Sequence, residues 1–201
     1  MLPEKDGPAT SKDGLRERKR RETLQRITEV GMGLFLQKGY EATTLDEIAA
    51  AAGISRRTFF YYFKSKDDIL LSLQNEMGEV IVTSLKTQTL DRRPLDAVRD
   101  AVIAVCSRFP TDEMMAIDEL MRSSPAVQAR KQASYVQHED DLFQALRERW
   151  PDPQRETGLR LVAMLSMGAI RLSFEALKRE NGARPIADLL REAFNALKAE
   201  I

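Results

Sequence analysis

Apolar residues recur along most of the chain at the three- or four-residue spacing of an amphipathic helix. In the first such stretch Leu24, Ile27, Leu34 and Phe35 share one face, and Gly39 ends the pattern. No segment alternates apolar and polar positions for long enough to predict a strand. The pattern therefore predicts an all-α protein with helices over residues 15–38, 44–52, 56–63, 66–89, 94–109, 112–123, 126–149, 154–180 and 185–200.

The segment 43–68 predicts three helices that begin in close succession, separated by very short connections. Thr44 followed by Glu47 is the pattern of a capping box, in which each residue satisfies a free amide of the other. Gly53 permits the positive φ of a tight turn, and Ser55 is a good N-cap for the next helix. Short helices joined by so tight a turn are typical of a helix–turn–helix unit that reads DNA.

The helix after Ser55 begins with side chains suited to base edges. Arg56, Arg57 and Thr58 occupy its first turn, which is the part of a recognition helix that reaches into the major groove. An arginine fork meets guanine O6 and N7 together. Phe60 can touch a thymine methyl. We therefore expect these four residues to read or adjoin the bases.

Other residues of the segment are suited to the DNA backbone. Tyr61 and Tyr62 carry hydroxyls that can bond phosphate oxygens, and Lys66 precedes the next helix start. The basic run 16–21 can add phosphate or minor-groove contacts. By contrast, the spacing of Phe59 and Phe63 places both on one face, where we expect them to pack inward.

Charge is distributed unevenly although the net charge is zero. Residues 1–66 hold 13 Lys or Arg and 9 Asp or Glu, which is +4, and residues 67–201 hold 18 and 22, which is −4. Phosphate attraction is local because salt screens it over about 10 Å. The basic part of the chain is thus the part with the helix–turn–helix pattern. A charged helix start alone is more often a solvated surface. DNA binding is favoured here because the arginine pair occurs together with the capped short helices and the glycine turn.

The stretch 39–70 resembles the DNA-binding domain of TetR-type bacterial transcriptional regulators, and the close match spans residues 20–73. The resemblance implies a DNA-binding domain at 15–65 and a helical ligand-binding and dimerisation domain at 66–201, and the polar composition of residues 1–14 predicts a disordered tail. The resemblance also implies phosphate contacts from Thr44 and Ser55. Position 60 is often tyrosine in the family, so Phe60 keeps the apolar contact and loses a hydroxyl.

The segment 159–177 is apolar around most of its circumference, and the last helix carries an apolar stripe. Such a helix must be covered on several sides, either by its own chain or by a second subunit. The resemblance implies that the last two helices form a two-fold interface, which matches a palindromic operator. The predicted interface residues are Leu161, Leu165, Gly168, Leu172, Leu189, Leu190, Phe194 and Leu197.

Six of the eight methionines follow Lys66, which favours an adaptable apolar cavity for a hydrophobic small molecule. An ordinary bundle core explains each residue equally well. The candidate ligand-binding residues are Met77, Ile81, Val102, Phe109, Met114, Met121, Tyr135, Phe143 and Met164.

Catalytic, metal and cofactor sites are not predicted. The consecutive residues His138 to Asp141 point in different directions on a helix, so we expect a solvated face. Cys106 is the only cysteine and lies among apolar residues, which favours packing. The apolar run 161–170 is too short to cross a bilayer, and no secretory signal is evident.

The sequence predicts a cytoplasmic, homodimeric repressor that a hydrophobic ligand releases from a palindromic operator. A helical ligand-binding or protein-interaction module without a DNA role remains the alternative.

Overall fold

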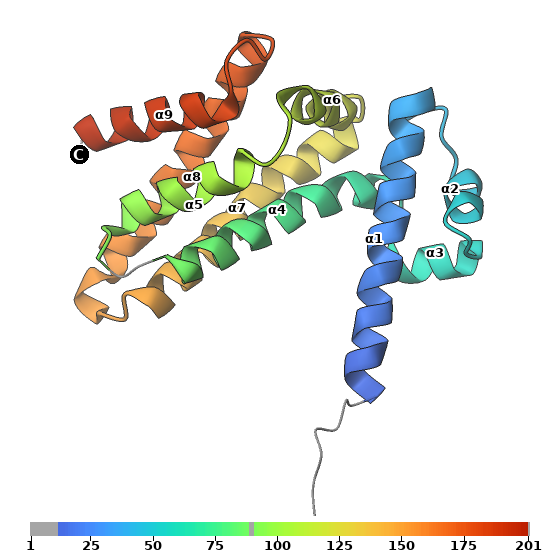
Figure 1. Ribbon diagram of the computed structural model, residues 1–201, viewed down its shortest axis with the longest axis horizontal. Coiled ribbons are helices and arrows are strands. Elements are labelled where there is room, and N and C mark those ends of the chain that lie inside the picture. The colour runs from blue at the N-terminus through green and yellow to red at the C-terminus, as the bar shows by residue number, and fades with distance from the viewer. Residues whose placement is uncertain (1–11, 89–90, 201) are drawn as a thin grey trace, which may run out of the picture. The chain divides into compact units, whose positions relative to one another are not determined.

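The computed structural model describes residues 12–88 and 91–200. This part of the chain is helical, without strands, as predicted (Figure 1). The first helices are α1 (Lys12–Lys38), α2 (Leu45–Ala51), α3 (Arg56–Tyr62) and α4 (Asp67–Thr87). They are followed by α5 (Pro94–Cys106), α6 (Thr111–Arg122), α7 (Pro125–Arg149), the 3₁₀ turn η1 (Pro153–Arg155), α8 (Glu156–Arg179) and α9 (Ile186–Glu200).

The chain divides into two compact units, residues 1–69 and 70–201, with the boundary inside α4. The predicted tail at 1–14 lies mostly outside the described residues. Its last three residues belong to α1, which begins at Lys12 and not near Leu15.

The first unit packs α1, α2, α3 and the start of α4 around a small core. Phe35, Ile48 and Phe59 are almost fully inaccessible to solvent, and so is Ile69. Gly31 explains how α1 approaches this core so closely, because a Cβ there would lie 2.8 Å from Cδ1 of Ile69. The unit is therefore held by a few large apolar side chains from four different helices.

The turn between α2 and α3 has the predicted backbone conformation. Gly53 adopts φ +66°, and its amide donates to the carbonyl of Ala50 at 3.1 Å. The Ile54 amide closes the turn on the carbonyl of Ala49 at 2.9 Å. A left-handed residue at this position is costly for any side chain but glycine. α3 consequently runs across the end of α2 (Figure 1).

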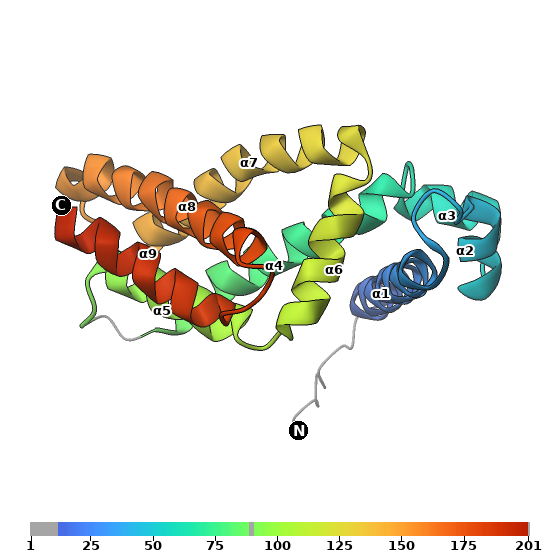
Figure 2. The same cartoon turned by 90° about the horizontal axis from the view of Figure 1, so that it is seen from above.

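In the second unit α8 packs against α7 and α9, and α5 packs against α8 and α9 (Figure 2). Val98, Leu146, Ala163 and Leu190 are fully buried between these helices. Cys106 belongs to the same core, and its burial raises the pKa of the thiol to about 11. The thiol is therefore neutral at physiological pH and acts as a packing group.

The helical stretch Pro153–Arg179 is long and apolar enough, by length and composition alone, to cross a membrane. The prediction from the sequence rests only on the nearly uninterrupted apolar run 161–170, which is too short to cross a bilayer. The core helix of a soluble protein passes the same test. One face of α8 is such a core face, because Leu159, Ala163 and Leu177 are buried.

Candidate DNA-binding interface

Side-chain caps at the starts of α2 and α3 set the geometry of the candidate interface. The Thr44 hydroxyl accepts the Glu47 amide at 3.3 Å, and Glu47 Oε2 accepts the Thr44 amide at 2.8 Å. This is the predicted capping box. At α3, Ser55 Oγ accepts the Thr58 amide at 3.0 Å. Both predicted phosphate-contacting hydroxyls are exposed, but each already has a partner within the protein.

Glu47 also links α2 to the end of α1 through a hydrogen-bonded ion pair with Lys38. This hydrogen bond, followed by those from Thr44, lowers the Glu47 pKa from 4.5 to about 2. A depressed carboxylate pKa contributes stability above the unfolded pKa that is lost as the pH falls through the folded pKa. The capping box is therefore sensitive to acid.

We expect the stability of the first unit to fall between pH 4.5 and 2 partly through Glu47. Glu47→Gln should be less stable at neutral pH and should lose part of that pH dependence, because the amide does not titrate. Thermal melts followed by circular dichroism across this range measure the effect. Glu29→Gln, an exposed carboxylate on α1, is the control. Identical pH profiles for wild type and Glu47→Gln would contradict the assignment.

Arg56 is exposed but held in place. Its Nη1 lies 3.2 Å from both carboxylate oxygens of Asp46 on α2. Its guanidinium also lies 5.8 Å from the centre of the Phe60 ring, one turn further along α3. Arg56 therefore has two side-chain partners, one on each helix of the helix–turn–helix.

Arg57 is exposed and has no side-chain partner within the described residues. Thr58 is half-buried, and its hydroxyl lies 2.8 Å from Ser55 Oγ. Among the three residues of the first turn of α3, Arg57 is thus the one whose polar group is entirely uncommitted.

The aromatic residues of α3 separate into an inner and an outer set. Phe59 and Phe63 are buried, as predicted, with ring centres 5.8 Å apart. Phe60 is 47% exposed and Tyr61 is 73% exposed. Tyr62 is half-buried, with its ring edge-on to that of Tyr61 at 5.1 Å. The outer rings form an apolar surface with hydroxyls, which suits a DNA groove and its phosphates.

Lys66 has a role that sequence reasoning missed. Its Nζ donates to the carbonyl of Tyr40 at 2.7 Å and lies 3.4 Å from that of Thr43. The ammonium also lies 4.1 Å from the centre of the Tyr40 ring, and the side chain is only 23% exposed. Lys66 therefore ties the α1–α2 loop to the start of α4. An ammonium has three donors, so the predicted phosphate contact stays a prediction.

Lys64 is a further phosphate-contact candidate that the sequence analysis did not single out. It is exposed, and its ammonium has no partner within the described ranges. Asp68 accepts the amides of Lys64 at 2.6 Å and of Ser65 at 3.2 Å. Both amides thus already have an acceptor, and the Lys64 ammonium is the group at this position that remains available to a phosphate.

The basic run on α1 is exposed but partly neutralised. Arg18 pairs with Glu22 at 3.3 Å, and Glu17 lies 3.5 Å from Arg20 and 3.8 Å from Arg21. Exposed pairs of this kind contribute little to stability, and the phosphate or minor-groove contacts of this run stay a prediction.

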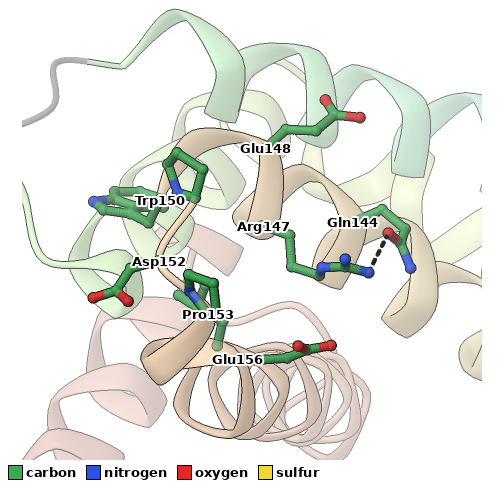
Figure 3. Close-up of a pocket in the computed structure, with 9 residues that line it drawn as sticks. Gln144, Arg147, Glu148, Trp150, Asp152, Pro153 and Glu156 are labelled. Atoms are coloured by element: carbon green, nitrogen blue, oxygen red, sulfur yellow. Dashed lines mark hydrogen bonds between the residues drawn. The ribbon is translucent and has the colours of Figure 1, made fainter.

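Two hollows lie in the second unit. One, of about 330 Å³, lies beside the α7–α8 turn, where Arg147, Trp150, Pro153 and Glu156 line it (Figure 3). The other, of about 310 Å³, is lined by residues of α4 and α7, including His138. His138 Nε2 lies 3.3 Å from Asn75 Oδ1, and burial lowers the pKa of the imidazole.

None of the nine predicted ligand-binding residues lines either hollow. Val102, Met114 and Phe143 are part of the core, and Met77 and Ile81 pack against it. For these five the structure agrees with the alternative of an ordinary bundle core. An amphipathic stripe marks the side chains that face inward but does not show whether space remains between them.

The other four predicted ligand-binding residues are scattered. Met121 is buried and Tyr135 is half-buried, whereas Phe109 and Met164 are exposed. The nine residues therefore do not all line one of these two hollows, and their part in ligand binding stays a prediction.

The predicted dimer residues on α8 and α9 have different environments. On α8, Leu161, Leu165 and Leu172 are exposed. A Cβ on Gly168 would meet nothing within 4 Å. These four residues leave an apolar face of α8 uncovered by the chain itself.

On α9 the predicted residues pack in or against the core of their own chain. Leu189, Leu190 and Phe194 are buried in the core of the same chain, and Leu197 packs against that core. The chain itself thus covers Leu189, Leu190 and Phe194, and the place of α9 in a two-fold interface stays a prediction.

The residues 138–141 lie on α7. Within the described residues, no group of three or more His, Cys, Asp or Glu side chains is placed to hold a metal ion. Glu139 and Asp140 instead pair with Arg160 of α8 at 3.2 and 2.9 Å.

Comparison with known proteins shows two family matches. Residues 27–73 match the family of bacterial regulatory proteins, tetR family, and residues 92–201, more than half of the chain, match the MftR C-terminal domain. The regulator TcmR of Streptomyces glaucescens is 34% identical over 119 residues, which are 57% of this chain and 53% of TcmR. The chain thus spans about half the length of this relative.

Two solved structures share the fold. FadR of Thermus thermophilus, a repressor solved in complex with lauroyl-CoA, has a TM-score of 0.53 and 24% identity, covering 87% of this chain and 92% of FadR. SmeT, the repressor of a Stenotrophomonas maltophilia multidrug efflux pump, has a TM-score of 0.61 and 22% identity, covering 88% of this chain and 89% of SmeT. At these identities the likeness concerns the fold alone.

Proposed function

The chain belongs to the TetR family of bacterial regulatory proteins, and on that basis we propose that it is a cytoplasmic, sequence-specific DNA-binding transcriptional regulator. The observation that carries this proposal is the exposed start of α3. There, a capped helix presents an uncommitted Arg57 beside an oriented Arg56, with exposed aromatic residues on the following turn. Arginine on a recognition helix is the side chain best suited to guanine in the major groove.

The regulator acts as a homodimer on a palindromic operator. The uncovered α8 face of Leu161, Leu165, Gly168 and Leu172 supports this part of the proposal, because a contiguous exposed apolar surface is a common sign of a protein contact. Two copies related by a two-fold axis present two recognition helices to half-sites one helical turn apart.

A hydrophobic small molecule releases the repressor from DNA. The core of the second unit supports this, because Met77, Met114, Met115 and Met167 lie in or against it, and methionine repacks readily around a ligand. The lauroyl-CoA bound by FadR gives one chemical example from a protein of the same fold. The ligand must bind the released state more tightly than the DNA-bound state.

Arg57→Ala tests base reading. We expect binding to an operator selected from random duplexes to weaken roughly 5- to 150-fold for each half-site, because each protomer loses one bidentate guanine contact. Binding to random duplex should change little. Fluorescence anisotropy over a range of salt concentrations measures both affinities.

Two further variants serve as comparisons. Lys64→Ala should weaken cognate and random binding alike and flatten the slope of log K against log salt by about 0.9 for each protomer bound. Arg108→Ala, an exposed arginine of the second unit, should leave both affinities unchanged. If Arg57→Ala weakens cognate and random duplexes equally, Arg57 does not read bases.

A further inference from the structure

Asp46 and Arg56 form a contact between the two helices of the helix–turn–helix that neither the fold nor the caps require. The residues are ten positions apart, and the contact joins the first turn of α2 to the first turn of α3. Both carboxylate oxygens lie 3.2 Å from the same nitrogen, Nη1 of Arg56. Because 60% of the Arg56 side chain and 68% of the Asp46 side chain are exposed, the pair adds little to stability.

The contact leaves one edge of the guanidinium free. Nε and Nη2 of Arg56 make no hydrogen bond to the described residues, whereas Nη1 is occupied by Asp46. These two nitrogens form a planar pair of donors, which matches the acceptor pair O6 and N7 of guanine. The Phe60 ring, 5.8 Å from the guanidinium carbon, limits motion on a further side.

An oriented arginine reads DNA differently from a free one. A free arginine has many rotamers, and it loses side-chain entropy when it adopts the one geometry that meets a guanine. A phosphate oxygen accepts a hydrogen bond from almost any direction, so an arginine loses less side-chain entropy when it binds a phosphate than when it binds a guanine. A partner that holds Arg56 in advance therefore favours the base contact over non-selective phosphate contacts.

We propose that Asp46 is a specificity-determining positioning residue, which holds Arg56 through Nη1 so that its Nε–Nη2 edge meets a guanine of the operator. The inference rests on the proposed function, since it concerns how the same interface selects its sequence. Asp46 touches Arg56 and not the DNA. Its negative charge also weakens non-selective attraction to phosphate at the same place.

The test compares Asp46→Asn with wild type on two duplexes, the operator that wild type selects from a random pool and a random duplex of equal length. The amide keeps the shape of Asp46 but removes the charge that holds Arg56. We expect the ratio of operator to random affinity to fall about 2- to 10-fold. The salt slope on random duplex should steepen by about 0.9 for each protomer bound, because each released arginine gains a phosphate.

Glu29→Gln is the matched control for charge. Glu29 is an exposed carboxylate of the same unit that accepts a hydrogen bond from Gln25 Nε2 at 2.8 Å, with no cation paired to it within the described chain. This variant removes one negative charge without releasing an arginine. It should keep the wild-type affinity ratio, so a change confined to Asp46→Asn reports on Arg56.

A double-mutant cycle identifies the residue through which Asp46 acts. Arg56→Ala should abolish the preference for guanine at one base pair of each half-site, and Asp46→Asn should relax the preference at the same base pair. The double variant should have the affinity ratio of Arg56→Ala alone. Melting curves confirm that the variants remain folded.

The outcomes separate this inference from the proposed function. Wild-type protein that selects no sequence overturns both. Wild-type protein that selects an operator, with Asp46→Asn and Glu29→Gln giving the same affinity ratio, overturns only the role of Asp46. Relaxation at a base pair that Arg56→Ala leaves unchanged also overturns it.

Discussion

Leu161→Glu combined with Leu172→Glu should separate the protein into monomers and weaken operator binding roughly 100- to 10,000-fold, because the second half-site is no longer bound from the same molecule. These leucines are 50% and 58% exposed, the most exposed of the α8 face. Four buried carboxylates at a two-fold contact repel one another and lose hydration. Analytical ultracentrifugation measures the assembly, and anisotropy measures operator affinity.

The matched control for this double variant is Val136→Glu. Val136 lies on α7 and is 68% exposed, so it tests whether any exposed apolar-to-acidic change has the same effect. It should leave both the dimer and the operator affinity unchanged. A double variant that stays dimeric with full operator affinity would show that the α8 face is not the interface.

Phe59→Ala should unfold the first unit or destabilise it by about 3–5 kcal/mol, because it empties the centre of a small core. Phe59 is fully buried, and its ring centre lies 5.8 Å from those of both Phe60 and Phe63. DNA binding should be lost with the fold of this unit. The second unit has its own core, so the dimer should persist.

Urea unfolding followed by circular dichroism, together with sedimentation, measures these two effects separately. Phe109→Ala is the control, since Phe109 is 39% exposed and belongs to the second unit. It should lower the stability far less. Unchanged stability and DNA binding in Phe59→Ala would contradict the proposed core of the first unit.

Local features of the interface could be predicted from the sequence because their causes lie within four residues. The capping box of Thr44 and Glu47, the cap at Ser55 and the left-handed Gly53 are of this kind. Helical periodicity also placed Phe59 inside. Each depends on backbone amides or side-chain spacing that the neighbouring residues determine.

Contacts between distant residues could not be predicted in this way. Lys66 and Tyr40 are 26 positions apart, and no local pattern indicates that they meet. The sequence predicts the apolar stripe of α9 correctly. The spacing of its residues does not show that Leu190 is buried against its own chain. Periodicity identifies a buried face and leaves open which surface covers it.

Selection of random duplexes by the wild-type protein, followed by sequencing, tests the central claim most directly. The account predicts enrichment of a palindrome whose half-site centres lie about 10 base pairs apart, or a multiple of that, with a guanine in each half-site whose preference disappears in Arg57→Ala. Binding should also fall steeply as salt rises. A bound pool with no enriched sequence, or binding that is independent of salt, would contradict the account.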